Sequence, residues 1–450
     1  MTSCKLSLGW VLVTTFSMSC LGLQNGAGLK PPLGWSTWKT CGDRGCVHDY
    51  CDEMEVKEVA EAMIQNGMLD LGYEFVLLDD CWAMGRDPDT NVLVEDPERF
   101  PSGMAKLSEW LHERNMKFGL YTSIGNETCS SGGRDIVVPG SEGFFELDAK
   151  TFADWQVDYV KLDFCGNMKD PLYGLPRGKA YHEEFASALV GAQGDGSRPI
   201  FLEVVAGYWF AREEVAGIAN SWRFCEDHHD DWGSTKEALL CLKSQRNRWA
   251  DVEGMPGGWP YLDLSMVGGE GCGGEEDYVA HCPKQTDDNY KVEWATWGLM
   301  QSPIIVSTDV REMTEIMEKA ILNQELIQYH QDVDCPGGGL IRHGGDGDEF
   351  LFGRQVGESC KDWLIVAVNF GGKGDVNIVV DMGRDLGWAE GTGEVKVRDL
   401  WEGEDIGVVE EEEFEVKVGA GGCEVLLFQR GGKRSGEGRA VMWRYNTMND

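Results

Sequence analysis

The stretch Asp158-Tyr159-Val160-Lys161-Leu162-Asp163-Phe164-Cys165 is an apolar strand pattern that ends in a lysine, an aspartate and a cysteine. A strand buried on both faces is uniformly apolar, so the two charges indicate that this strand runs out into a site. Lys161 and Asp163 are two positions apart and therefore point to the same face. In the mouth of a barrel the lysine would hold the aspartate ionised, as a nucleophile or a metal ligand requires. A structural Lys–Asp pair is the alternative that this stretch alone leaves open.

On both sides of this strand, short apolar segments alternate with amphipathic segments. Eight strand-then-helix units in about 300 residues are the size and rhythm of a (β/α)8 TIM barrel, an α/β fold that we expect over residues 30–332. A doubly wound open sheet is the alternative, but no glycine-rich phosphate loop follows the first strand. We expect strands at 33–38, 73–82, 117–123, 158–165, 199–205, 221–224, 257–263 and 303–309, and helices at 53–71, 104–115, 150–155, 179–192, 211–219, 235–247, 289–300 and 312–329.

Polar side chains collect at the carboxyl ends of these predicted strands. In a barrel those ends form one face, and active sites lie on that face. Convergence from so many strands is hard to explain as scattered surface charge, so we expect a single site there. Its expected members are Asp79, Asp80, Tyr121, Lys161, Asp163, Glu203, Arg223 and Asp263.

After Asp334 the pattern changes to short alternating apolar runs separated by glycine and charged turns. This pattern predicts a small antiparallel β-sandwich over residues 335–430, with a structural role. Residues 431–450 are rich in Gly, Arg and Ser and are expected to be a disordered tail.

The composition limits the partners. The chain has 40 basic and 77 acidic residues and a formal charge of -37, which repels phosphate backbones and anionic membranes. Nucleic acid is therefore excluded as an expected partner. The 17 tryptophans mostly indicate core packing, although indole faces also suit sugar rings.

The N-terminus indicates the secretory pathway. Residues 1–25 combine one positive charge with an apolar run that contains Thr, Ser and Gly, which predicts a signal peptide rather than a membrane anchor. No other long apolar segment follows, so we expect no membrane span after signal removal. The sequon at Asn126 predicts glycosylation and fits the same compartment. The expected destination is extracellular, or a lysosome or vacuole.

Cysteine usage agrees with an oxidising compartment. Removal of Cys4 and Cys20 with the signal leaves 13 of the 15 cysteines, which predicts disulfides with one thiol left over. The cluster of Cys41, Cys46 and Cys51 with Cys81 predicts two bridges, and a zinc site is the competing interpretation. The partners of the later cysteines stay open: Cys225, Cys241, Cys272, Cys282, Cys335, Cys360 and Cys423.

Two acidic groups on either side of a sugar are the minimum for glycoside hydrolysis. Asp163 beside Lys161 could attack an anomeric carbon, and the acidic stretch 221–232 offers a second carboxyl group to protonate the leaving oxygen. Asp79 and Asp80 could instead bind a metal, but no histidine appears at the other strand ends. Acceptors that grip sugar hydroxyls are the simpler interpretation, and we expect no metal and no cofactor.

Several motifs resemble family 27 of the glycoside hydrolases, the α-galactosidases (melibiases) and α-N-acetylgalactosaminidases. The resemblance covers residues 33–334 and extends more weakly through the sandwich. The motifs are Gly34-Trp35 with Trp38, Leu78-Asp79-Asp80-Cys81-Trp82, Asp96-Pro97-Glu98-Arg99-Phe100-Pro101-Ser102-Gly103, Gly119-Leu120-Tyr121, Lys161-Leu162-Asp163-Phe164-Cys165, Trp222-Arg223 with Asp227, and Pro256-Gly257-Gly258-Trp259 with Asp263.

The resemblance implies a retaining exo-glycosidase with Asp163 as the nucleophile and Asp227 as the acid and then the base. It also implies a carbohydrate substrate with a terminal α-galactose. The implied sugar pocket consists of Trp38, Asp79, Asp80, Tyr121, Lys161, Glu203, Arg223 and Asp263, and the implied disulfides are Cys41–Cys81, Cys46–Cys51 and Cys129–Cys165.

Specificity is where the sequence departs from the family pattern. Glu203 favours galactose, because in the family a glutamate there binds the 2-hydroxyl, whereas Ala206 resembles the acetamido enzymes. Gly207 stands where a tyrosine is expected, and the stretch 260–263 replaces the usual Asn-Asp-Pro-Asp. The alternatives are therefore an α-N-acetylgalactosaminidase or another pyranosidase, such as a β-L-arabinopyranosidase. An inactive sugar-binding protein would be expected to lack one of the two catalytic carboxyl groups. We expect an acidic working pH and allow for a homodimer.

Overall fold

The computed structural model describes most of the chain. The described residues are 23, 25–39, 51–129, 137–170, 174–194, 198–205, 207, 210, 212–249, 254–272, 279–344, 347–389, 393–410 and 412–431. The predicted signal peptide and tail, apart from residues 23, 25 and 431, lie outside this part of the chain, as do Cys41, Cys46 and Ala206.

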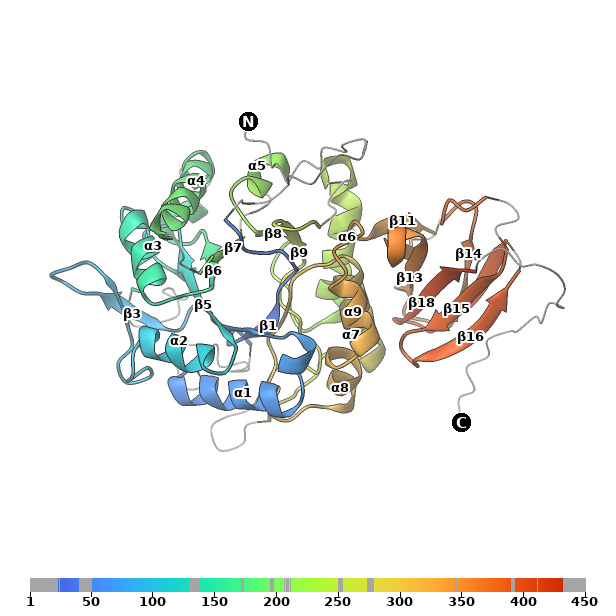
Figure 1. Cartoon of the computed structure of the whole chain (residues 1–450), viewed down its shortest axis with the longest axis horizontal. Coiled ribbons are helices and arrows are strands. Elements are labelled where there is room, and N and C mark those ends of the chain that lie inside the picture. The colour runs from blue at the N-terminus through green and yellow to red at the C-terminus, as the bar shows by residue number, and fades with distance from the viewer. Residues whose placement is uncertain are drawn as a thin grey trace, which may run out of the picture.

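The predicted barrel is confirmed as an eight-stranded parallel sheet that curls on itself (Figure 1). Its strands follow one another in chain order, and the first strand also pairs with the last. A parallel bridge between Ser265 and Val306 links the remaining two edges. The strands are β1 Leu33–Ser36, β2 Phe75–Leu78, β5 Lys117–Ser123, β6 Tyr159–Asp163, β7 Phe201–Val204, β8 Ser221–Arg223, β9 Trp259–Tyr261 and β10 Ile304–Val306.

Helices cover the outer face of this sheet (Figure 1). In the first of them Val56, Val59, Ala60 and Met63 recur at helical spacing and are all buried, so one apolar stripe faces the strands. Asp52 caps its N-terminus by accepting a hydrogen bond from the backbone of the first turn. The helices are α1 Glu53–Gln65, α2 Met104–His112, α3 Phe145–Asp154, α4 Gly174–Ala192, α5 Arg212–Ala216, α6 Trp232–Trp249, α7 Asp287–Leu299, α8 Glu315–Ile321 and α9 Gln324–His330.

The prediction of one continuous helix over 312–329 was wrong, because α8 and α9 are separate helices. The Asn323 side chain accepts a hydrogen bond of 3.0 Å from the backbone of Leu326 and so caps α9. An asparagine that bonds to the backbone in this way starts a new helix instead of continuing the old one. The sequence also gave no sign of the hairpin of β3 Ala83–Arg86 and β4 Leu93–Glu95, which projects from the barrel (Figure 1).

The C-terminal part forms antiparallel sheets, as predicted, at one end of the long axis of the molecule (Figure 1). A six-stranded sheet and a two-stranded sheet enclose a second apolar core, which includes Leu351, Ile365, Val380, Val416 and Phe428. The strands are β11 Gly339–His343, β12 Glu349–Val356, β13 Asp362–Asn369, β14 Val376–Asp381, β15 Val395–Asp399, β16 Glu404–Val409, β17 Glu413–Val418 and β18 Cys423–Arg430. Contacts of α7 with β12, β13 and β18 join these sheets to the barrel.

The disulfides differ in part from those that the resemblance implies. Cys81 pairs with Cys51, so the expected pairs Cys41–Cys81 and Cys46–Cys51 are wrong in this structure. Each sulfur forms one bridge, and three cysteines close together in sequence do not reveal which of them the fold brings to within the 6.2 Å Cα separation found here. Cys129–Cys165 is confirmed, and Cys423 is buried and free, in agreement with the expected odd thiol. The other pairs are Cys225–Cys241, Cys272–Cys282 and Cys335–Cys360.

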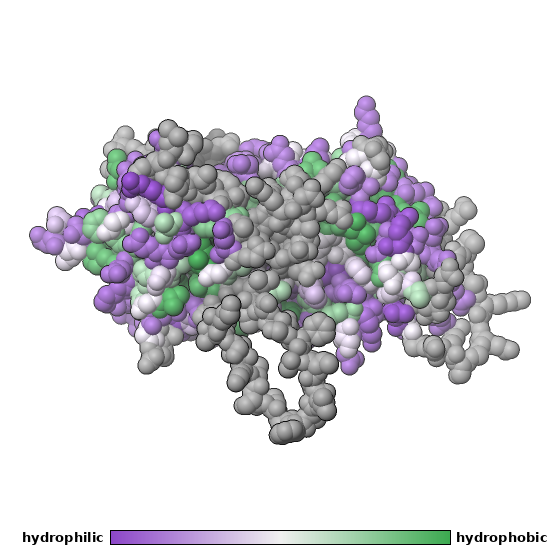
Figure 2. All heavy atoms as spheres, turned by 90° about the horizontal axis from the view of Figure 1, so that it is seen from above, coloured by the Kyte–Doolittle hydropathy of each residue, from purple (hydrophilic) through white to green (hydrophobic). Residues whose placement is uncertain are grey.

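The coloured part of the surface is mainly hydrophilic. Seen from above, purple side chains predominate and green ones form small groups (Figure 2). Among the described helices, none has both the length and the apolar character needed to cross a bilayer.

The guanidinium of Arg354 on β12 ties the barrel to the C-terminal sheets. The residue is 1% exposed and donates to the carbonyl oxygens of Tyr329 at 2.5 Å, Pro336 at 2.8 Å and Cys335 at 3.1 Å, as well as to that of Asp332. One side chain therefore satisfies the end of α9 and the segment that follows it.

We expect Arg354→Met to lower the free energy of unfolding by at least ~3 kcal/mol, because several buried carbonyl groups would lose their donor. Denaturant unfolding of the purified protein measures this change. Lys150→Met is the control, since the Lys150 side chain is 66% exposed and its ion pair with Asp154, itself 62% exposed, contributes little. Equal unfolding midpoints for the two variants would contradict the role given to Arg354.

Candidate active site

The predicted strand-end residues do converge at the carboxyl-terminal mouth of the barrel. β6 supplies Lys161 and Asp163, and the register places Lys161 beside Tyr121 of β5 on one side and Glu203 of β7 on the other. Lys161 interacts electrostatically with Asp79, Glu203, Asp263 and Asp163. Charged side chains from different strands therefore share one small, largely buried volume.

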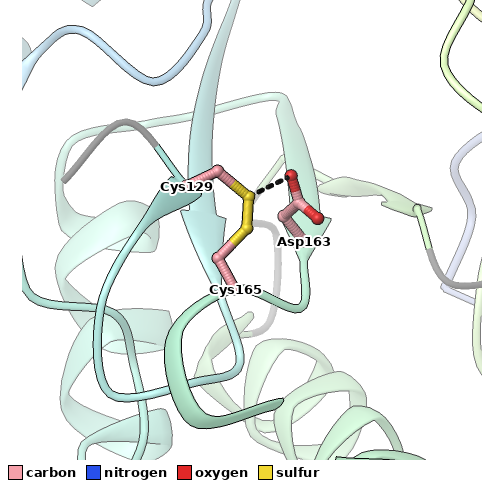
Figure 3. A group of neighbouring side chains, drawn as sticks. All are labelled: Cys129, Asp163 and Cys165. Atoms are coloured by element: carbon pink, nitrogen blue, oxygen red, sulfur yellow. Dashed lines mark hydrogen bonds between the residues drawn. A yellow bond between two sulfur atoms is a disulfide. The ribbon is translucent and has the colours of Figure 1, made fainter. Parts of the chain in front are cut away.

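Two hydrogen bonds hold Asp163, and a disulfide lies beside it. Its Oδ2 accepts a hydrogen bond of 2.9 Å from the Tyr121 hydroxyl, and its Oδ1 accepts one of 2.8 Å from the backbone NH of Phe164. A sulfur of the Cys129–Cys165 disulfide lies 3.3 Å from Oδ2 (Figure 3). The carboxylate therefore has fixed oxygens at the end of its strand.

Cys129, Asp163 and Cys165 are the one group of potential metal ligands found among the described residues. Cys129 and Cys165 are bonded to each other, so neither offers the thiolate that a metal needs. The disulfide instead links the end of β6, which carries Asp163, to the loop that follows β5 (Figure 3).

The direct partner of Lys161 differs from the one expected. Its ammonium group lies 2.7 Å from Asp79 Oδ2, whereas no ion pair joins it to Asp163 within the described part of the chain. Register explains this difference, because a long inward side chain crosses the mouth to β2 more easily than it folds back along its own strand. Lys161 also lies 5.3 Å from the ring centre of Trp38, so indole, ammonium and carboxylate are adjacent.

Burial is the largest influence on the nucleophile candidate. It raises the pKa of Asp163 above its ordinary value, while the charges of Lys161 and Arg223 and the hydrogen bonds from Phe164 and Tyr121 act against the rise. The expectation that Lys161 alone holds this carboxylate ionised was therefore too simple. Two cations and two donors share that task.

Arg223 joins two further carboxylates. Its guanidinium is 2.9 Å from Asp263 Oδ2 and forms an ion pair with Asp227. Asp227 is the exposed member, with 58% of its side chain accessible, whereas Asp263 is buried. The carboxyl group of Asp227 thus faces solvent at the mouth, while its partner Arg223 is fixed by the buried Asp263.

Asp263 occupies a strained position. Its φ of 80° lies in the left-handed region, which a buried non-glycine residue rarely adopts. Burial acts to raise its pKa, but the charges of Arg223 and Lys161 and the backbone NH groups of His228 and Leu264 hold that pKa below its ordinary value. The backbone strain directs an ionised carboxylate at Arg223.

Glu203 points into the barrel and is 1% exposed. The Tyr159 hydroxyl donates to its Oε2 at 2.5 Å, while Oε1 has no hydrogen-bond partner among the described residues. Burial raises the pKa of Glu203 to about 7, against the charge of Lys161 and the bond from Tyr159. A carboxyl group with one oxygen fixed and one unsatisfied is suited to receive a polar group of a ligand.

Gly207 lies just after this strand, where its Cβ position is already occupied. A Cβ there would be 2.3 Å from the carbonyl oxygen of Arg223 and 2.9 Å from Cβ of Trp222. The tyrosine that the family pattern places here would not fit this backbone. The departure at Gly207 therefore creates no empty volume at that point.

Several positioning residues escaped sequence reasoning. Tyr159 was treated as an ordinary strand residue, although it lies two positions before Lys161 on the same inward face. Thr37 accepts a hydrogen bond from the backbone NH of Asp79, and Trp82 donates its indole NH to the carbonyl oxygen of Tyr121. The sequence could have predicted only the inward direction of Tyr159, because the bonds of Thr37 and Trp82 depend on how neighbouring strands align.

Carboxylates, two cations and an indole in the mouth of a barrel are typical of the class of carbohydrate-cleaving hydrolases. The comparisons with known proteins are specific. The family model for alpha galactosidase A matches residues 30–332, and that for the alpha galactosidase C-terminal beta sandwich domain matches residues 356–428.

The chain is 31% identical over 383 residues to the alpha-galactosidase of Cyamopsis tetragonoloba, covering 84% of this chain and 81% of that protein. It is 30% identical to human alpha-galactosidase A, covering 81% and 80%. The crystal structure of alpha-galactosidase I from Mortierella vinacea superposes with a TM-score of 0.74 at 25% identity, covering 92% of this chain and all of that one. This protein belongs to the α-galactosidase family, family 27 of the glycoside hydrolases.

We expect Tyr121→Phe to move the acid limb of kcat/KM to higher pH. The Tyr121 hydroxyl donates to the ionised form of Asp163, so its removal disfavours that form and raises the pKa of the carboxyl group. Below neutral pH kcat/KM should fall by about tenfold or more. Tyr73→Phe is the control, because the Tyr73 hydroxyl bonds to the carbonyl oxygen of Ile321 outside the site. An unmoved acid limb in Tyr121→Phe would contradict this coupling.

Proposed function

We propose that the chain releases terminal, non-reducing α-D-galactosyl residues from oligosaccharides, glycolipids or glycoproteins, with retention of configuration. The observation that supports this proposal most strongly is the fixed Asp163 carboxylate beside Lys161, Tyr121 and the exposed Asp227 at one barrel mouth. The alpha-galactosidases named above add the galactose specificity.

In this reaction an oxygen of Asp163 attacks the anomeric carbon while the glycosidic C–O bond breaks, and Asp227 gives its proton to the leaving oxygen. Asp227 then takes a proton from water, whose oxygen attacks the same carbon and releases Asp163. Exposure suits Asp227 for both transfers, because its proton must reach a leaving group and later come from water. The ion pair with Arg223 orients the Asp227 carboxyl group.

The remaining strand-end residues would hold the sugar. Asp79 and Asp80 supply acceptors for hydroxyl groups, Lys161 supplies donors, and the ring of Trp38 supplies an apolar face. Charge-assisted hydrogen bonds of this kind are shorter and stronger than neutral ones. Such a set favours a single terminal pyranose over an internal one.

Galactose is favoured over its 2-acetamido analogue by two features. Glu203 offers the unsatisfied Oε1 as a partner for a 2-hydroxyl group, and Gly207 opens no space because the backbone of Arg223 fills its side-chain position. A site with a buried polar group discriminates strongly against a substrate that leaves that group unpaired.

The test is hydrolysis at about pH 5 of p-nitrophenyl α-galactoside beside its 2-acetamido analogue. We expect kcat/KM to favour the plain galactoside by roughly 10²-fold or more, and we expect Asp163→Asn to lose at least about 10⁴-fold with either sugar. Preference for the acetamido sugar would overturn the specificity. Turnover of neither sugar would overturn the galactose assignment, and full activity of Asp163→Asn would overturn the nucleophile.

We further infer passage through the secretory pathway, which the five disulfides among the described residues support. Asn126 begins the sequon and is exposed, so a glycan there would not displace packed groups. We expect Asn126→Gln to remove one N-glycan from protein secreted by a eukaryotic host, as a mass difference before and after enzymatic deglycosylation would show. An unchanged mass would contradict glycosylation at this site.

A further inference from the structure

A buried polar network lies behind the turn that carries Asp227. Its centre is His228, whose side chain is fully buried and lies 3.8 Å, Nε2 to Oε2, from the equally buried carboxyl group of Glu293 on α7. Neither residue belongs to the predicted site, and the reaction described above uses neither. Burying a titratable pair is costly unless it is fully hydrogen-bonded, so its bonds indicate what it does.

The hydrogen bonds around Gln285 fix the direction of each donor. Its amide nitrogen lies 3.4 Å from Glu293 Oε2 and 3.5 Å from Asp230 Oδ1, so the NH₂ group must face these two carboxylates. Its Oε1 therefore accepts, and it accepts from the Thr235 hydroxyl at 3.0 Å. The Thr235 proton is thereby committed to Gln285.

The protonation of His228 follows from these directions. Its Nδ1 lies 2.9 Å from the carbonyl oxygen of Leu264 and must carry a proton to bond to it. Its Nε2 lies 3.2 Å from the Thr235 oxygen, whose own proton points elsewhere, so Nε2 must donate as well. Both ring nitrogens are donors, which describes an imidazolium ion.

Glu293 supplies the matching negative charge. Its Oε1 accepts from the Ser265 hydroxyl at 2.8 Å and from the backbone NH of Met266 at 2.7 Å. Gln285 donates to Oε2, so every neighbour of the carboxyl group offers a proton. Burial raises the pKa of Glu293, and the positive charge of His228 acts against that rise.

The pair connects directly to the catalytic turn. The backbone NH of His228 donates to Asp263 Oδ2 at 2.9 Å, and Asp263 in turn holds Arg223, the ion-pair partner of Asp227. The same ring fixes the turn to the segment after β9 and to the start of α6. Asp227 immediately precedes His228 and therefore takes its backbone position from this anchor.

We propose that His228 and Glu293 form a buried imidazolium–carboxylate pair that acts as a positioning device for Asp227. The other charged groups that face the pair are Asp230, which accepts from the Tyr290 hydroxyl at 2.6 Å, and Asp263. The inference rests on the proposed acid and base role of Asp227, which the experiment below tests separately.

The experiment compares a substrate that needs a general acid with one that does not. Methyl α-galactoside has a poor leaving group that needs a proton, whereas the 2,4-dinitrophenolate group of 2,4-dinitrophenyl α-galactoside leaves without protonation. We expect Glu293→Gln and His228→Gln each to lower kcat/KM by roughly 10² for the methyl glycoside and by less than about threefold for the dinitrophenyl glycoside. The double variant should lose no more than either single variant, because the two residues act as one unit.

His112→Gln is the matched control. It breaks a His–carboxylate pair of similar type, His112 Nε2 to Asp158 Oδ2 at 2.6 Å, at the opposite end of the barrel. Any loss of kcat/KM in His112→Gln should be equal for the two substrates. Equal losses on both substrates in Glu293→Gln would show a purely structural role and overturn the proposal. Asp227→Ala must itself show the leaving-group dependence; if it does not, the proposed function fails instead.

A second measurement uses the unaltered protein. With histidine ring nitrogens labelled with ¹⁵N, one ring should keep protons on both nitrogens at pH 8, above the titration of free imidazole near about 6.5. That signal should vanish in His228→Gln and persist in His112→Gln. A single proton on the ring of His228 would overturn the charged pair even if the variants failed to fold.

Discussion

The buried guanidinium of Arg223 is the interaction on which the rest of the site depends. It binds Asp227 from the loop after its own strand and Asp263 from the next strand end, and its charge, with that of Lys161, acts against the rise that burial causes in the pKa of Asp163. Removing one partner from a buried ionic cluster leaves an uncompensated charge, which costs far more than the cluster gains in stability. At the mouth of the barrel two cations therefore balance part of the charge of several carboxylates, and these groups meet only when the strands that carry them are in place.

The balance has a conformational cost. Asp263 adopts a left-handed φ of 80° although it is not a glycine, and it is held there by the backbone NH groups of His228 and Leu264 as well as by Arg223. Strain of this kind persists only where the surroundings over-determine the conformation. The polar network around Glu293 belongs to those surroundings, because it fixes the segment that follows Asp263. Rigidity is thus concentrated around Asp227, the carboxyl group that we propose as the proton donor.

The sequence predicted the order of the strands and the strand-end residues well, because both follow from local rules. Apolar runs of strand length and inward residues two positions apart do not depend on distant parts of the chain. The partner of Lys161, the pairing of Cys81 with Cys51 and the break at Asn323 could not be read in this way. Each is decided by which groups the folded chain brings into contact, and a sequence offers several equivalent candidates for every one of them.

Arg354 has a consequence for the order in which the molecule is completed. The carbonyl groups at the end of α9 and after it receive their donors from a strand about 20 residues further along the chain, and α7 packs against strands that come later still. During synthesis these helices leave the ribosome before the strands of the C-terminal sheets do. Until the C-terminal sheets have folded, some carbonyl groups at the end of the catalytic domain therefore lack their hydrogen-bond donors. The barrel therefore completes its hydrogen bonds and packing only when the sandwich has folded, and a chain without the sandwich would lack them.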